Sequence, residues 1–248
     1  MLKTFHFQTI DSTSNYVKKL LNQGEKTTFC VISDEQTKGR GSHSRSWNSP
    51  KGNLYLTLAI EQTKQRERKI PLKMGVILAQ WIQQKFNIKV MIKWPNDILF
   101  EGKKIAGILC ETNTMNAKKH LCLGIGINIF ISPEVKEQRN YESSCLEKIK
   151  AINQNLKEIQ NSLVFFLEQN ISRLDSEELI EDLPNFLTPI NSLWQNKVTK
   201  EFFFDQGLNN EGYLKLKPLA KEKSDLIVGS HNEYSWCFQK DFKTARFE

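Results

Sequence analysis

Two motifs near the middle of the chain most constrain what it can fold into. Residues 93–97 read Lys-Trp-Pro-Asn-Asp, and residues 104–108 read Lys-Ile-Ala-Gly-Ile. Apolar residues typical of strands lie beside both motifs, and Pro95 biases the residue before it toward extended backbone. We therefore expect neighbouring strands that hold a cation, an amide and a carboxylate in fixed positions, as the wall of an active site does.

The composition excludes several classes of protein. Of the 248 residues, 39% are hydrophobic and 25% charged, which is typical of one globular domain with room for a small second one. No stretch reaches the roughly 18 apolar residues of a membrane span, and the N-terminus lacks the apolar core of a secretion signal. Five scattered cysteines without a C-x-x-C pair indicate neither a disulfide framework nor a zinc site. We expect a cytoplasmic protein without a membrane partner.

The charge favours a polyanionic partner. A net charge of +7 and a pI near 9.1 attract nucleotides, nucleic acids and acidic proteins through long-range fields. Charge alone does not choose among these partners, and a solvated lysine-rich face is the simplest explanation of any single basic run.

Periodicity predicts a mixture of helices and strands. Ser12 and Thr13 offer N-cap oxygens ahead of apolar residues at helical spacing, and Pro71 suits the first turn of an amphipathic helix. The helices are expected over residues 14–23, 71–86, 156–167 and 179–183, and the main strands over residues 28–32, 54–60, 90–92, 105–111 and 121–129. The polar stretch 112–120 is expected to join the last two strands as a hairpin.

The pattern changes near residue 195. Short alternating stretches separated by glycines follow Trp194, which indicates a small β-module. We therefore expect a main domain over residues 1–195 and a small β-domain over residues 196–248, in which residues 231–248 carry no interpretable signal. Strands, helices and hairpins together favour the α+β class over a regular βαβ alternation.

Two glycine-containing segments complete the pattern. Residues 39–47 read Gly-Arg-Gly-Ser-His-Ser-Arg-Ser-Trp and lie between two expected strands. Glycines let the backbone approach a phosphate closely, and arginine donates charge-assisted hydrogen bonds to it, although a Gly-Arg pair alone also occurs in ordinary turns. Residues 124–128, Gly-Ile-Gly-Ile-Asn, place two glycines at strand spacing, as expected where a flat ring lies on the backbone.

In order and spacing, these four motifs resemble the catalytic domain of biotin protein ligases. The resemblance implies a class II synthetase-like biotin/lipoate ligase fold, in which helices flank a mixed β-sheet and a small SH3-like β-domain follows. It implies an enzyme that forms biotinyl-5'-AMP from biotin and ATP, then transfers biotin to a lysine of the biotin carboxyl carrier protein of a carboxylase. Because Asp11, at the first expected helix, lies so near the first residue, we expect the monofunctional type, without an N-terminal DNA-binding domain and without a DNA partner. The resemblance also allows a homodimer.

The resemblance assigns roles to individual residues. Lys104, directly before the apolar-Ala-Gly run, is expected to act with Arg40 in catalysis, because a fixed ammonium stabilises charge developing between a carboxylate and a phosphate. The residues expected to contact biotin are Ser12, Thr13, Gln36, Gly39, Arg40, Lys104 and Gly107. Those expected to contact the nucleotide are Arg45, Trp47, Lys93, Asn96, Asn128 and Tyr141. Asp97 is expected to contact the Mg²⁺ that accompanies ATP, since this ion needs few protein oxygens.

The chain departs from the fullest family pattern at two loop positions. Ser42 stands where those ligases carry arginine, and Ser44 where they carry glycine. Loss of a guanidinium over a phosphate removes a contact worth about 1.5–3 kcal/mol, so we hypothesise that this enzyme releases activated biotin more readily.

Two alternative functions remain open at this point. A lipoate or octanoate ligase or transferase would share the fold, but the Trp-Pro-Asn-Asp segment favours biotin. A non-enzymatic nucleic-acid binder would explain the charge, and its binding would fall steeply with salt. It would not explain the spacing of Lys104 and Asp97.

Overall fold

A large mixed sheet forms the main body of the protein. The computed structural model describes residues 2–61, 69–115, 118–134, 142–188, 192–219, 224–228 and 234–237. The strands of the large sheet are β1 (Lys3–Ile10), β2 (Phe29–Gln36), β3 (Leu54–Glu61), β4 (Met91–Lys93), β5 (Asp97–Phe100), β6 (Lys103–Met115) and β7 (Lys118–Ile127). Among the described residues they are ordered β1-β2-β3-β7-β6-β5-β4. Only the β1–β2 pair of this described sheet is parallel, and the other neighbours are antiparallel.

The hairpin of β6 and β7 is longer than the sequence suggested. We expected the polar residues 112–120 to form a connection, but Thr112 pairs with Leu121 and the ladder continues to Met115 opposite Lys118. That expectation was wrong because polar residues are compatible with a strand wherever its side chains reach solvent. The tight turn at Glu101 and Gly102, both with positive φ (46° and 78°), joins β5 to β6.

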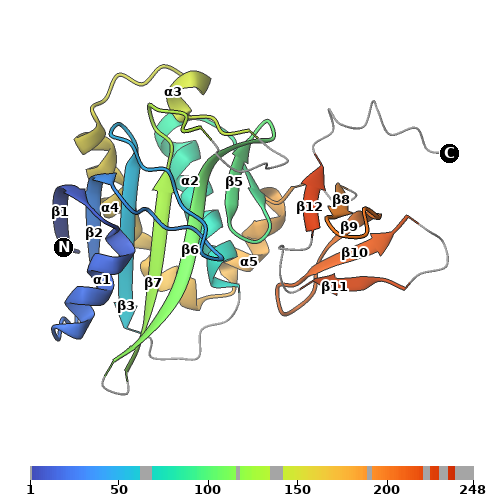
Figure 1. Ribbon diagram of the computed structural model, residues 1–248, viewed down its shortest axis with the longest axis horizontal. Helices are drawn as coiled ribbons and strands as arrows, with labels where there is room; N and C mark the ends of the chain where they lie inside the picture. The colour runs from blue at the N-terminus through green and yellow to red at the C-terminus, as the bar shows by residue number, and fades with distance from the viewer. Residues whose placement is uncertain are drawn as a thin grey trace.

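Helices cover both faces of the large sheet (Figure 1). The helices are α1 (Thr13–Asn22), α2 (Ile70–Phe86), α3 (Leu146–Ile149), α4 (Leu156–Asn170) and α5 (Glu178–Asp182). On β2, Cys30 and Ile32 join the main core with α2 and α4, whereas Phe29 and Val31 join a smaller core with α1. This alternation puts α1 on the face opposite α2 and α4, because successive strand residues point to opposite faces. The mixed sheet flanked by helices is confirmed.

A small antiparallel sheet follows. Its strands are β8 (Leu193–Asn196), β9 (Phe202–Leu208), β10 (Leu214–Pro218), β11 (Leu226–Val228) and β12 (Tyr234–Cys237), ordered β11-β10-β9-β8-β12 within the described residues. Because β8 pairs with β9 and β12, we propose that the domain boundary expected near residue 195 lies just before Leu193. The indole Nε1 of Trp94 donates to the carbonyl of Gly212 at 3.0 Å and so links the small domain to the motif at residues 93–97.

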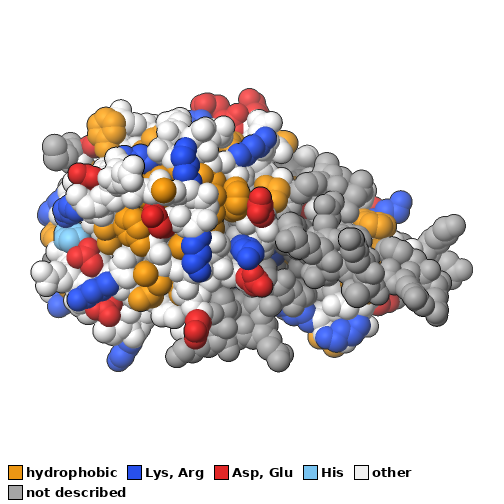
Figure 2. All heavy atoms as spheres, turned by 90° about the horizontal axis from the view of Figure 1, so that it is seen from above, with side chains coloured by type: hydrophobic (Ala, Val, Ile, Leu, Met, Phe, Trp, Pro, Cys, Tyr) orange, Lys and Arg blue, Asp and Glu red, His pale blue; other side chains and the backbone are white. Residues whose placement is uncertain are grey.

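The surface, the described helices and the cysteines bear on three expectations: a polyanionic partner, the absence of a membrane span and the absence of disulfides. On the face seen in Figure 2, lysine and arginine side chains alternate with acidic ones and with apolar patches, so the positive charge is not gathered there. None of the helices in the described ranges combines the length and apolar character of a membrane-spanning segment. The four cysteines with described side chains are free thiols, listed in chain order as Cys30, Cys110, Cys122 and Cys145.

Candidate active site

The predicted site residues converge on the face of the large sheet that carries α1. A pocket there is bounded by the start of α1, the glycine-arginine segment at residues 39–47, and the strands β5, β6 and β7. The predicted residues that line it are Ser12, Thr13, Gln36, Arg40, Trp47, Asn96, Asp97, Lys104 and Gly107. Its cavity is only about 50 Å³, whereas an adjoining open hollow beside Arg40, Arg45 and Glu111 measures about 760 Å³.

A cluster of hydroxyl groups lies at the start of α1. Ser12 caps the helix, with extended backbone (φ −160°) and a side chain that accepts from the amide of Asn15. Both the amide and the hydroxyl of Thr13 donate to Gln36 Oε1, at 2.8 and 3.1 Å. Thr57 of β3, which the sequence did not single out, lies 2.8 Å from the Thr13 hydroxyl. These buried donors and acceptors suit a neutral polar ligand group in an otherwise apolar pocket.

The glycine-arginine segment is packed tightly against its own neighbours. Gly39 approaches the carbonyl of Trp47 and the hydroxyl of Ser49 so closely that a Cβ atom would clash with both. The Trp47 amide donates to the Gly39 carbonyl at 2.9 Å, and the Gly41 amide to the Arg45 carbonyl at 2.8 Å. Gly39 therefore shapes the loop rather than lining the pocket.

Arg40 ties the loop to the helix and the sheet. Its guanidinium donates to Asn15 Oδ1 of α1 at 2.9 Å and to Glu111 Oε1 of β6 at 2.6 Å. Lys18 lies 3.0 Å from the same Glu111 oxygen. Sequence reasoning missed Asn15 and Glu111. Glu111 could have been found, because it follows Gly107 at even spacing on β6 and so points to the same face.

Arg45 folds back onto the loop. Its Nε donates to the Ser42 carbonyl and one terminal nitrogen donates to the Ser42 hydroxyl, both at 3.0 Å. His43 and Ser44 between them have φ values of 57° and 59°, in the left-handed region that costs L-residues about 1–2 kcal/mol. Ser44 therefore occupies a conformation that glycine adopts without this cost.

The flat ring that lies on the strand glycines is the protein's own Trp47. A Cβ atom on Gly107 would lie 2.9 Å from the indole, and one on Gly126 would lie 2.6 Å from it. The Lys104 ammonium lies 5.0 Å from the ring centroid, within cation–π range. The indole Nε1 is buried without a hydrogen-bond partner in the described structure, and the ring lines the pocket.

The two central motifs meet at a carboxylate between two lysines. Asp97 of β5 accepts from the Lys104 ammonium through Oδ1, and its Oδ2 lies 3.8 Å from Lys93 Nζ. All three side chains are buried, which strengthens their electrostatic interaction. Burial lowers the pKa of Lys93 to about 8, opposed by Asp97 and assisted by the charges of Lys104 and of Lys197.

The remaining predicted contacts have structural partners. The Asn96 side chain donates to the Ile108 carbonyl at 2.7 Å, and the Ile108 amide donates back to the Asn96 carbonyl at 2.9 Å, so this residue joins the two motifs. The side-chain Nδ2 of Asn128 donates to the Ser144 carbonyl at 2.9 Å, and its buried Oδ1 has no partner in the described structure. Asn128 does not line the pocket. Tyr141 lies outside the described residues.

No described cluster of three or more His, Cys, Asp or Glu side chains could hold a metal ion. Asp97 offers one carboxylate, and two ammonium groups already face it. This donor set suits Mg²⁺ that arrives already bound to ATP, because phosphate oxygens and water supply most of its ligands. It does not suit a resident ion.

Comparison with known proteins agrees with this geometry. Residues 6–128 match the model of the biotin/lipoate A/B protein ligase family. The bifunctional ligase/repressor BirA of Bacillus subtilis (strain 168) is 35% identical over 132 residues, which cover 52% of this chain and 41% of that protein. The protein of the same name from Escherichia coli (strain K12) is 28% identical over 219 residues, which cover 84% of this chain and 67% of that one. The biotin--[acetyl-CoA-carboxylase] ligase of Paracoccus denitrificans is 30% identical over 131 residues, covering 50% of this chain and 53% of that one. The chain thus spans less than half the length of the Bacillus relative.

Solved structures show the same fold. The biotin protein ligase from Aquifex aeolicus in complex with biotin and ATP superposes with a TM-score of 0.76 at 23% identity, covering 95% of this chain and 99% of that one. The enzyme from Leishmania major in complex with biotinyl-5-AMP gives a TM-score of 0.65 at 23% identity, covering 92% and 99%. At this identity the likeness concerns the fold. With the family match and the convergence of the motifs at one pocket, it leads to one conclusion: residues 6–128 form a domain of the biotin/lipoate A/B protein ligase family.

Proposed function

We propose that this chain is an ATP-dependent biotin protein ligase. The observation that carries the proposal is the buried Lys104–Asp97 pair, which opens onto the pocket that also receives the hydroxyl cluster at the start of α1. The pair supplies a fixed cation, the Lys104 ammonium, and the hydroxyl cluster beside it suits the neutral polar ring of biotin. The names of the relatives and the ligands in the Aquifex and Leishmania complexes support biotin as the substrate.

In the proposed first step, a carboxylate oxygen of biotin attacks the α-phosphorus of ATP, and the bond to pyrophosphate breaks. Both reactants are anionic, so a cation between them lowers the repulsion and stabilises the developing charge. Asp97 holds the Lys104 ammonium at the pocket. Asp97 also interacts with Lys93, whose burial lowers its pKa to about 8. Mg²⁺ would enter with ATP, neutralising part of the phosphate charge, and Asp97 is the carboxylate expected to contact it.

In the proposed second step, the amine of a carrier lysine attacks the acyl carbon of biotinyl-5'-AMP, and AMP leaves. The loop at residues 39–47 would cover the adenylate and exclude water. Arg40, bound to Asn15 and Glu111, anchors that loop to α1 and β6. The carrier would be the biotin carboxyl carrier protein of a carboxylase, and a net charge of +7 suits an acidic carrier. We also propose a cytoplasmic location, because ATP is the substrate, and a homodimer, which sedimentation velocity would test.

The experiment is ATP–pyrophosphate exchange with biotin, and with lipoate as the alternative acid. Lys104→Gln keeps a hydrogen-bond donor for Asp97 but removes the charge, and it should lower biotin-dependent exchange by about 10²–10³-fold. Lys103→Gln is the matched control, because the neighbouring lysine is exposed and pairs with Glu142. Equal loss in both variants would contradict the role of Lys104. Exchange with lipoate alone would move the protein to the lipoate branch of the family, and exchange with neither acid would refute the ligase proposal.

A further inference from the structure

The guanidinium of Arg40 is held at both ends, by one residue of α1 and one of β6. One terminal nitrogen donates to Asn15 Oδ1 at 2.9 Å, and the other donates to Glu111 Oε1 at 2.6 Å. Asn15 lies in the first turn of α1, and Glu111 lies on β6. The guanidinium thus bridges the helix and the sheet, and Arg40 lines both the pocket and the adjoining open hollow.

The side-chain amide of Asn15 has a fixed orientation. Its Nδ2 donates to Asp11 Oδ2 at 2.9 Å, and its Oδ1 is thereby left to accept from Arg40. The same bond from Asn15 is the largest cause of the lowered pKa of the Asp11 carboxyl. A rotated amide would place its NH2 group against a guanidinium, which has no acceptor. Asp11 therefore selects the orientation of Asn15 that holds Arg40.

Glu111 is tied to the site through a single oxygen. Its Oε1 accepts from Arg40 and from the ammonium of Lys18, 3.0 Å away, whereas its buried Oε2 has no partner within the described structure. The side chains of Glu111 and Arg40 are 20% and 38% exposed, so water and salt screen this pair less than one in open solvent. A carboxylate beside a pocket for two anionic substrates would repel both of them unless cations offset its charge. Of the two cations that do so, Arg40 lines the pocket and Lys18 does not.

We propose that Glu111 and Asn15 are positioning residues for adenylate formation and act through Arg40. Because both ends of the guanidinium are held, it stays at the pocket before the substrates arrive, and less conformational entropy is lost when it meets their charges. Without Glu111 or Asn15, Arg40 keeps its charge but loses its fixed position beside Lys104, and catalysis depends on that geometry. This inference rests on the proposed ligase function for the identity of the substrates.

ATP–pyrophosphate exchange with biotin measures the effect of positioning. Glu111→Ala should lower kcat about tenfold, the effect of losing one charge-assisted contact, and Asn15→Ala should lower it about threefold. Glu111→Gln keeps an acceptor oxygen and should fall less than Glu111→Ala. In an Arg40→Gln background, Glu111→Ala should change kcat by less than about twofold, because the side chain that it positions is gone. A merely structural role of Glu111 would persist without Arg40, so an equal loss in both backgrounds would overturn the proposal.

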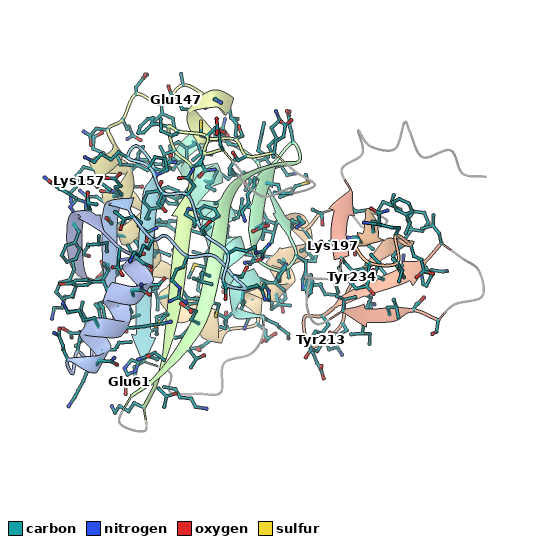
Figure 3. All side chains as sticks on the ribbon, in the orientation of Figure 1. Glu61, Glu147, Lys157, Lys197, Tyr213 and Tyr234 are labelled. Carbon is teal, nitrogen blue, oxygen red and sulfur yellow. The ribbon has the colours of Figure 1, made fainter. Side chains whose placement is uncertain are left out.

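Two control variants separate positioning from a general effect of lost charge. Lys18→Gln removes the other cation from the same Glu111 oxygen and should leave kcat within about twofold of wild type. A loss equal to that in Glu111→Ala would mean that Glu111 serves α1 rather than Arg40. Glu61→Gln removes a glutamate–lysine pair, with Lys118, at the end of β3. Figure 3 shows Glu61 at the lower end of the large sheet, and this variant should also retain kcat.

A measurement on the ligand-free protein stands without the ligase reaction. The Gly41 amide, which donates to the Arg45 carbonyl at 2.8 Å, should exchange its hydrogen about tenfold faster in Glu111→Ala, because Arg40 no longer anchors the loop. An unchanged rate would overturn the anchoring. Failure of the ligase proposal looks different. In that case the wild type would show no biotin-dependent exchange of pyrophosphate, while protection of the Gly41 amide would still depend on Glu111.

Discussion

Replacing Gly126 by alanine should push the Trp47 indole off the sheet. A Cβ atom there would lie 2.6 Å from Cε2 and Nε1 of the ring and 2.8 Å from Cζ2. Carbon atoms pack at about 3.5–4.0 Å, so the ring must shift by about 1 Å. Gly107 lies under another edge of the same ring, and a small tilt therefore brings no relief.

The expected cost follows from two opposing terms. Overpacking of this kind costs about 1–3 kcal/mol. Replacing glycine by alanine in a strand also lowers the entropy of the unfolded chain, which returns about 0.4–1 kcal/mol. We therefore expect a net loss of roughly 0.5–2 kcal/mol in the free energy of unfolding. For a protein of this size, each 1 kcal/mol corresponds to about 2–4 °C in Tm.

Denaturant unfolding and tryptophan fluorescence would measure this effect. Gly41→Ala is the control in the adjoining loop, since a Cβ atom there would meet its nearest neighbour, the Arg45 carbonyl, at an ordinary 3.5 Å. The decisive comparison repeats Gly126→Ala in a Trp47→Ala background, where the clash is absent and the cost should vanish. If Gly126→Ala costs the same with and without the indole, the stacking argument is refuted.

Two further predictions concern the loop and the small domain. Ser42→Arg should slow release of the adenylate about tenfold and reduce labelling of bystander lysines, because it adds a charged donor over the phosphate. Ser46→Arg is the control, because Ser46 is an exposed position in the same loop. Adenylate release no slower in Ser42→Arg than in wild type would count against the hypothesis. Burial raises the pKa of Asp205 from 3.8 to about 6, and the hydrogen bonds from Gly207 and Trp194 oppose this rise. The protonated carboxyl therefore contributes stability below about pH 4, and this contribution is lost as the pH rises to about 6. By linkage, this pH-dependent contribution amounts to at most about 3 kcal/mol. The difference in unfolding free energy between wild type and Asp205→Asn should therefore change between about pH 4 and pH 6. A constant difference would contradict the shifted pKa.

Most of the local structure follows from the sequence, because its causes are local. The caps at Ser12 and the proline at the start of α2 act on neighbouring residues. The sequence predicts a strand leading into residues 93–97 and a strand over residues 105–111; in the structure, residues 94–96 form the turn between β4 and β5, and residues 105–111 lie in β6. The sequence did not predict β1 (Lys3–Ile10). The prediction for the stretch 112–120 was also wrong, because its polar residues are compatible with either a loop or a solvent-facing strand. Pairing with the partner strand decides between them, and periodicity does not contain that information.

The sequence by itself determined which chemical groups the site contains, through motifs whose order and spacing resemble one family. Only the tertiary structure decided how those groups are paired. Glu111 accepts a hydrogen bond from Arg40, and Asp97 lies between Lys93 and Lys104. The indole of Trp47 lies on the strand glycines. The tertiary structure also decided that Trp194, from a separate sheet, faces the Lys93 ammonium. These contacts join residues far apart in the chain, so they depend on sheet order and on packing between domains, which local sequence patterns do not encode.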